Sequence, residues 1–201
     1  MSRSNVKIVI VSVLFLFNTS CVKEAPLDSS SEANPYFDLK GLIDRQIYLL
    51  DSINPEVNMN AVISGEKESQ TLRKDSADWA ETLKLYAEAD LNKPVLRGQY
   101  TVTDSSLQDS DLRLKIYQAK SGAEAEIPYM KVFYQDSLSE VRRVETYFLE
   151  ENLLYSTQRN MSLEFDKKDG GVLLSAYSTT GKQKMIFRDS ILYQNVASLQ
   201  Y

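Results

Sequence analysis

The sequence contains no histidine and only one cysteine, Cys21. Without histidine, the chain can form no Ser-His or Cys-His nucleophile pair and no metal site that needs an imidazole ligand. A single cysteine forms no disulfide within the chain, so a hydrophobic core must stabilise the folded part. The 201 residues are enough for one domain with such a core.

The chain also lacks the roughly 20 consecutive apolar residues that a membrane-spanning helix needs. Its N-terminal apolar run, Ile8–Phe17, is shorter and is interrupted only by a serine. The run follows two basic residues, Arg3 and Lys7. Two small polar residues, Thr19 and Ser20, directly precede Cys21. A positive start and a short apolar stretch are typical of a secretory signal peptide.

This short apolar stretch, ending in small residues and a cysteine, resembles the lipobox of bacterial lipoproteins. In that family the cysteine thiol receives diacylglycerol, the signal is cut just before the cysteine, and fatty acids such as palmitate hold the protein on the membrane. Asn18 stands where the lipobox usually has an aliphatic residue. Lipoproteins of Bacteroidota-type envelopes accept looser lipoboxes. The resemblance therefore implies a signal peptide over residues 1–20 and lipid attachment at Cys21.

Two alternatives to the lipoprotein interpretation are an ordinary secretory signal followed by a free cysteine and an uncleaved signal anchor. The physical argument for acylation is that each buried methylene contributes about 0.8 kcal/mol and that stable anchoring needs more than one chain. A cysteine that carries two or three acyl chains meets this condition. We therefore expect a membrane anchor at Cys21, and the resemblance implies that it lies in the cell envelope, at the outer membrane.

The charge balance restricts the partners of the chain. It has 23 basic and 28 acidic residues, and the first 20 residues carry two basic and no acidic ones. The chain from Cys21 onward therefore has a net charge of about −7. Nucleic-acid binding needs a basic surface, so we expect no nucleic-acid partner. The acidic balance also disfavours attachment to anionic lipid by charge alone, which leaves lipidated Cys21 as the expected membrane contact and an envelope protein as a possible partner.

Composition divides the rest of the chain into two parts. Residues 21–34 are rich in Ser, Glu, Asp and Pro, and such a segment buries too little apolar surface to offset its ordering entropy. We interpret it as a flexible tether between the lipid and the domain. Residues 35–201 form the expected single domain.

The domain begins with a helical pattern over residues 36–53, which Asn34 would cap. A hairpin is expected at 57–63 and 68–74, and a second helix with Asp78 and Glu81 as its capping box and Pro94 as its end. The apolar stripe expected for this second helix consists of Trp79, Leu83 and Tyr86, with Ala87. Gln46 lies in the middle of the apolar face of the first helix, where such a residue usually hydrogen-bonds a backbone group and less often reads a ligand.

The second half of the chain alternates apolar and polar residues between short turns. Turns are expected at Glu151–Asn152, at 166–171 and at Thr179–Lys182, the last followed by a strand over KMIF. The predicted fold class is α+β, with an amphipathic N-terminal helix, a hairpin and a second helix packed on an antiparallel β-meander. The runs ISGEKES, DWAETLKLYAEADLNKP and GQYTV resemble a group of uncharacterised Bacteroidota envelope lipoproteins, which implies a cellular context and no activity.

Several short motifs imitate active sites and are weak. Ser64–Lys67 matches S-x-x-K but falls in a turn, and Thr179–Lys182 lacks the spacing of a phosphate loop. Glu150 and Glu151 are neighbours on a strand, so they point to opposite faces. The acidic loop that holds Asp104, Asp109 and Asp111 lacks the glycine and final glutamate of an EF-hand. We predict no catalytic residue, no metal and no cofactor.

Two functional hypotheses remain open at this point. The first is a non-catalytic binding or assembly module of the envelope. The second is an acceptor for lipid or another hydrophobic ligand, in which the first helix covers a curved, half-barrel-like sheet; this is an analogy at the level of the fold only. A large apolar cavity under the helix favours the second, whereas a filled core with an exposed apolar patch favours the first.

Overall fold

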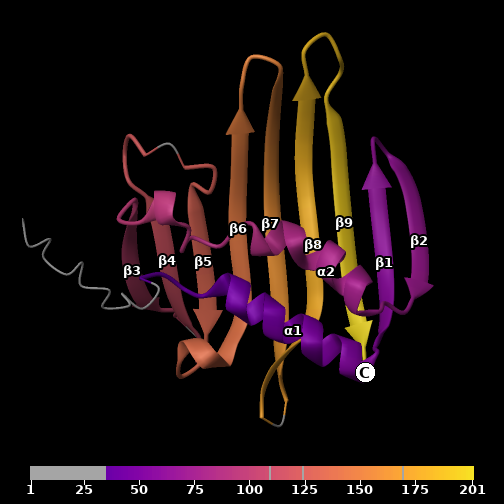
Figure 1. Cartoon of the computed structure of the whole chain (residues 1–201), viewed down its shortest axis with the longest axis vertical. Coiled ribbons are helices and arrows are strands. Elements are labelled where there is room, and N and C mark those ends of the chain that lie inside the picture. Colours follow the sequence, from indigo (N-terminus) through magenta and orange to yellow (C-terminus); the bar gives the residue numbers. More distant parts are fainter. Residues whose placement is uncertain (1–34, 109, 124, 169) are drawn as a thin grey trace, which may run out of the picture. The chain divides into compact units, whose positions relative to one another are not determined.

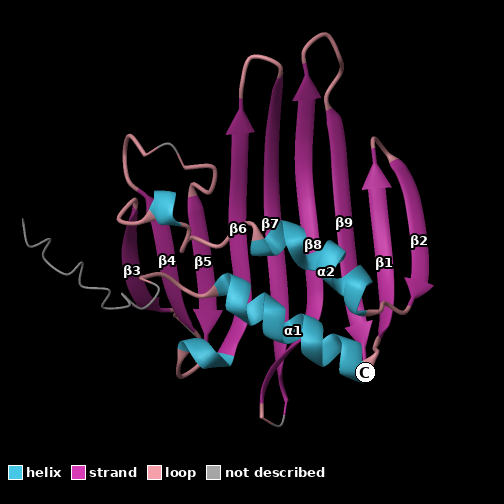
Figure 2. Ribbon diagram, viewed as in Figure 1, coloured by secondary structure: helices cyan, strands magenta, loops and turns pink. Residues whose placement is uncertain are grey.

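The computed structural model describes residues 35–201, with the exception of 109, 124 and 169. It is an open antiparallel sheet of nine strands with two α-helices on one face, an α+β architecture (Figures 1 and 2). Two short 3-10 turns, Pro94–Leu96 and Leu138–Glu140, complete the elements. The helices and strands are α1 (Leu39–Ile53), β1 (Glu56–Ile63), β2 (Glu66–Leu72), α2 (Ser76–Ala87), β3 (Tyr100–Ser106), β4 (Arg113–Ala119), β5 (Tyr129–Tyr134), β6 (Val141–Glu151), β7 (Tyr155–Lys168), β8 (Gly171–Met185) and β9 (Ile191–Gln200).

The strand order is β2-β1-β9-β8-β7-β6-β5-β4-β3. Strands β3 to β9 follow one another as a meander, and the β1–β2 hairpin pairs with the last strand of that meander. The β1–β9 ladder runs from Glu56 opposite Gln200 to Ile63 opposite Tyr193. The beginning and the end of the domain are therefore neighbours in the sheet.

Helix α1 begins later than the sequence indicates. Its N-cap is Asp38, whose side chain accepts a hydrogen bond from the Gly41 N–H at 2.9 Å. Asn34, the cap expected from the sequence, lies outside the described residues. The helix ends at Asn54, which adopts a left-handed conformation (φ 52°) and leads directly into β1. The apolar stripe of the helix is buried against the sheet and α2: Leu39, Leu42, Ile43 and Leu50.

Gln46 is the one polar residue in this buried stripe, with 2% of its surface exposed. Its Nε2 donates to the carbonyl oxygen of Val172 at 2.9 Å, and its Oε1 accepts from the N–H of Leu174 at 2.8 Å. The side chain thus hydrogen-bonds the backbone of β8, as the sequence predicts. It joins the middle of α1 to the strand beneath it.

The capping box of α2 differs from the expected one by three residues. The N-cap is Asp75, which accepts from the N–H of Asp78, and the Asp78 side chain accepts in return from the Asp75 N–H. Glu81 has no part in it. The helix ends at Ala87, before Pro94, which instead begins a 3-10 turn. The apolar stripe expected from the sequence, Trp79, Leu83 and Tyr86, is buried.

Tyrosines form much of the contact between the helices and the sheet. Tyr86 of α2 meets Tyr177 of β8 edge to face, with ring centroids 6.1 Å apart, and its hydroxyl pairs with that of Thr179 at 2.9 Å. Tyr36, just before α1, packs in the same way on Tyr100 and Tyr117. Such pairs contribute about 0.5–1.5 kcal/mol beyond the area that they bury.

The predicted turn at Thr179–Lys182 is wrong, because these residues lie inside β8. Gly181 occurs there for a packing reason: the Tyr193 side chain lies so close that a Cβ on Gly181 would be 2.4 Å from the tyrosine hydroxyl oxygen. The predicted KMIF strand is also wrong, since β8 ends at Met185 and the next two residues form the turn. Strand β9 was not predicted.

We expect Gln46→Ala to lower the free energy of unfolding by about 2–4 kcal/mol. The change leaves the carbonyl of Val172 and the N–H of Leu174 without their partner in a buried place. Urea unfolding followed by circular dichroism measures the effect. The control is Arg45→Ala, at the exposed neighbouring position, which we expect to change stability by less than about 0.5 kcal/mol. Equal stability of the two variants would contradict the role of Gln46.

Buried tyrosines also make stability depend on alkaline pH. Burial raises the pKa of Tyr86, of Tyr100 and of Tyr117 to about 12 in each case, whereas a tyrosine in the unfolded chain titrates near 10. The unfolded state therefore loses these protons first as the pH rises. Their contribution to stability is complete below about pH 10 and is lost between about pH 10 and pH 12.

Urea unfolding over this pH range measures the loss. In Tyr86→Phe we expect a shallower fall of stability with pH, because one titrating group is absent. Leu83→Ala, a neighbouring core change, should lower stability at every pH and leave the slope as in the parent. A Tyr86→Phe slope equal to that of the parent would show that this tyrosine does not control the alkaline transition.

Candidate functional site: the uncovered face of the sheet

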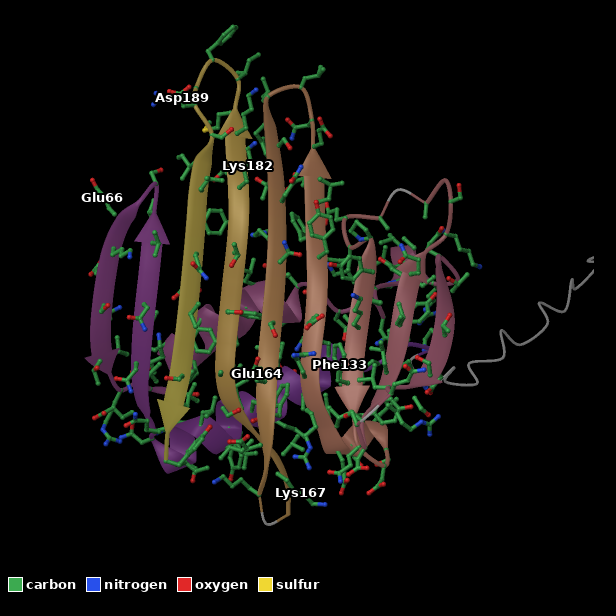
Figure 3. All side chains as sticks on the ribbon, turned by 180° about the vertical axis from the view of Figure 1, so that it is seen from behind. Glu66, Phe133, Glu164, Lys167, Lys182 and Asp189 are labelled. Atoms are coloured by element: carbon green, nitrogen blue, oxygen red, sulfur yellow. The ribbon has the colours of Figure 1, made fainter. Side chains whose placement is uncertain are left out.

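The two faces of the sheet differ in what lies on them. Helices α1 and α2 cross one face, while in Figure 3 the side chains of the other face are open to view with no helix in front of them. Because side chains alternate along each strand, the register shows which residues point to the uncovered face. Its central row joins Ser178, Ser162, Glu145 and Lys131, which are direct partners across β8, β7, β6 and β5.

Small polar side chains dominate the β7, β8 and β9 part of this face. They provide hydroxyl and amide groups and few charges, so the surface has many weak hydrogen-bonding positions at the spacing of the strands. An antiparallel sheet that is covered on one side commonly has such a polar outer face, because this face contacts water and not the core. The residues concerned are Gln158, Asn160, Ser162, Ser178, Thr180, Gln194 and Ser198.

An aromatic pair lies beside these polar side chains. Tyr129 of β5 and Tyr147 of β6 are opposite each other, and their rings stack with centroids 5.8 Å apart and planes inclined by 19°. The Lys131 ammonium is 5.0 Å from the centre of the Tyr129 ring. Burial, and next the Glu145 carboxylate, raise the pKa of Tyr129, so its hydroxyl stays protonated at neutral pH.

Tyr129 of the stacked pair borders a shallow hollow of about 190 Å³ on the uncovered face. Glu145 and residues of β7 and β8 with hydroxyl or amide groups also line it. These groups can donate and accept hydrogen bonds, but they include no nucleophile paired with a base. The remaining wall residues are Thr146, Asn160, Met161, Ser162, Ser178 and Thr180.

An ion pair and a cation–aromatic contact lie at the β5 and β6 side of the face. The Nε of Arg143 is 3.0 Å from Oε1 of Glu145, and the Arg143 guanidinium lies 4.2 Å from the centre of the Phe133 ring. The arginine therefore covers an aromatic ring that β5 turns to this face. The arrangement places aromatic, polar and ionic groups side by side on this part of the face.

The residues that imitate active sites do not come together. The structure places Glu150 and Glu151 on opposite faces of β6, and Glu150 accepts a hydrogen bond from the Tyr155 hydroxyl. The Ser64–Lys67 segment includes the turn between β1 and β2, as the sequence predicts. Thr179 is buried against Tyr86, so its hydroxyl has a structural partner.

The acidic residues compared above with an EF-hand loop are also divided between separate elements. Asp104 lies on β3, where its carboxylate pairs with Arg113 at 3.0 Å and with Lys115 at 3.2 Å. A hydrogen bond from the Tyr134 hydroxyl, and then these cations, lower the pKa of Asp104. Asp111 is in the loop that precedes β4, and Asp109 lies outside the described residues. Within residues 35–201, apart from the three undescribed positions, no group of three metal-binding side chains occurs.

Cys21, the predicted lipid-attachment site, also lies outside the described residues. Among the helices that the structure does describe, none combines the length and the apolar character needed to cross a bilayer. Comparison of the chain with protein families, with curated proteins and with solved structures finds no match in any of the three.

Sequence reasoning did not identify the uncovered face as a surface. Its residues come from β5 to β9, and their common side depends on a register that includes the unpredicted strand β9. A local signal existed in two nearly continuous polar runs, Thr157–Ser162 and Ser178–Gln183. These residues share a face only after the long strands β7 and β8 are recognised.

Proposed function

We propose that this protein is a lipoprotein of the cell envelope whose folded part is a non-catalytic binding or assembly module. Residues 1–20 act as the signal peptide, Cys21 carries the lipid and residues 21–34 join it to the domain at the outer membrane. The apolar run that ends before Cys21 supports the anchor. The net acidic charge supports attachment by lipid rather than by basic side chains.

The observation that carries the binding module is the one-sided covering of the sheet. Nine strands expose a face that α1 and α2 leave free, and this face has a stacked tyrosine pair beside hydroxyl and amide groups. Two of its charged groups, Arg143 and Glu145, form an ion pair. A partner that offers polar groups and aromatic or aliphatic side chains matches it, and an envelope protein has this chemistry.

A hydrophobic-ligand acceptor is the alternative function, and it needs space between the helices and the sheet. The centre of that space is occupied by large side chains that are at most 4% exposed and contact one another as one core: Leu50, Trp79, Leu83, Tyr86, Met130 and Tyr177. A hollow of about 350 Å³ remains at the margin, between α1 and the β7–β8 turn, and Arg45, Gln46 and Ser139 are among the residues that line it. The filled centre therefore favours the binding module.

The anchor is tested by the intact mass of the protein extracted from membranes of cells that make it. We expect a chain that starts at Cys21 and has the additional mass of two or three acyl chains. Cys21→Ser should show no acyl mass and should no longer remain with the membrane through a lipid. A wild-type chain cut at another position, or without added mass, would contradict the anchor.

The binding face is tested by photo-crosslinking in the same cells. A photo-reactive amino acid replaces Ser178 or Asn160 on the uncovered face, and Tyr48 on the exposed side of α1 is the control. We expect one adduct, of the same mass, from both face positions and not from the control. Tyr147→Ala, which removes the tyrosine stack, should reduce this adduct by about tenfold. Identical adducts from Ser178 and Tyr48 would contradict the proposal.

A further inference from the structure

Large apolar side chains are exposed at one end of the sheet. The β6–β7 and β8–β9 hairpins project beyond both helices, at the top of Figure 1. Leu153 is 94% exposed at the end of the first hairpin, and Phe187 is 96% exposed at the end of the second. We call these side chains and their exposed neighbours the apolar tip: Leu153, Leu154, Met185, Ile186, Phe187 and Leu192.

The two hairpins form one surface rather than two separate loops. The N–H of Ile186 donates to the carbonyl oxygen of Leu154 at 2.8 Å, which holds the turns together. Between them lies an open hollow of about 170 Å³ whose wall is mainly apolar. The neighbouring β1–β2 turn is attached as well, because the N–H of Ser64 donates to the carbonyl oxygen of Leu192 at 2.8 Å.

Phe187 combines two unfavourable features at one residue. Its φ of 60° is in the left-handed region, which a bulky side chain rarely adopts and which glycine or asparagine enters at lower cost. Its ring is also almost fully in water. Neither feature stabilises the isolated domain. A residue that is strained and exposed in this way is accounted for by an interaction made outside the chain.

We propose that the apolar tip inserts into the surface of a lipid bilayer. The tip presents separate projecting side chains on two turns and no deep groove, and such a shape fits a fluid apolar phase better than a peptide. Lys184 and Arg188 flank Phe187, with Asp189 beside them, so cationic groups lie where lipid phosphates would be. Aliphatic and aromatic side chains with basic neighbours are typical of segments that enter the interface by about 5–10 Å.

If Cys21 carries the proposed anchor, the chain between it and the domain is long enough to allow this contact. The fourteen residues Cys21–Asn34 span at most about 50 Å. The described chain starts next to Tyr36, whose ring packs on Tyr117 of β4. Tyr117 lies in the same row across the strands as Thr146 of β6, because Met130 of β5 is the partner of both. The tip lies about 25 Å further along the strands. An anchor in the bilayer and a tip on the same bilayer are therefore compatible.

Fluorescence quenching by brominated lipid tests the insertion at the residue itself. The full chain is reconstituted into phosphatidylcholine vesicles, with and without bromine on the acyl chains. Phe187→Trp and Leu192→Trp place a reporter in the tip, and Tyr48→Trp on exposed α1 is the control. Trp79 remains in place, because it is 0% exposed and gives every variant the same background.

We expect brominated lipid to reduce the emission of each tip reporter by about twofold or more and to leave that of the control unchanged. Quenching of the tip reporters no stronger than that of Tyr48→Trp would overturn the inference, and would leave a protein as the partner of the tip. Two tip reporters guard against one variant that fails to fold. The result is separate from the anchor, because quenching reports on the tip whether or not mass spectrometry finds acyl chains on Cys21.

Discussion

The pairing of β1 with β9 is the constraint on which the rest of the fold depends. The β1–β2 hairpin lies between the two helices in sequence, so its place in the sheet fixes where α1 ends and where α2 begins. Both helices start or stop at this edge and run across the same face of the sheet (Figure 2). The chain after α2 then continues to β3 at the opposite edge. A single ladder therefore fixes the edge of the sheet at which α1 ends and α2 begins.

Because the helices cover only one face, the two faces of the sheet differ in composition. The covered face contains the apolar core and its specific polar links, of which Gln46 and the Tyr86–Thr179 pair are the clearest. Because the apolar core lies on that side, the uncovered face can be polar without loss of stability. The side chains on its β7 to β9 part are mostly small and polar, which keeps a wide exposed sheet compatible with water.

Local patterns predicted the parts of the fold that depend on local chemistry. The apolar spacing of α2 identified Trp79, Leu83 and Tyr86, and Gln46 was expected to bind a backbone group, as it does. The turn predicted at Thr179–Lys182 was wrong because its glycine has a packing role. The segment has the composition of a turn, but Gly181 is needed because Tyr193 lies against it. The capping aspartates were assigned three residues late because several acidic residues occur in succession.

Features that depend on distant residues could not be predicted in this way. No local signal indicates that β1 pairs with β9. The residues of the uncovered face also share one side of the sheet only because of the register between neighbouring strands. The anchor at Cys21 remains a prediction from the sequence, since the structure describes residues 35–201 apart from 109, 124 and 169. The apolar tip was hidden for a different reason: KMIF has strand composition, and only the structure shows that the chain turns there.

The β1–β9 ladder has a consequence for the order in which the chain can fold. A polypeptide is made from its N-terminus, and the inner edge of β1 has no partner until the last ten-residue strand exists. Long-range pairing of this kind is slow to form because a long loop must close first. The sheet is therefore completed only when synthesis has delivered the C-terminal residues. Until then β1 has a free inner edge, and the core under the two helices is incomplete.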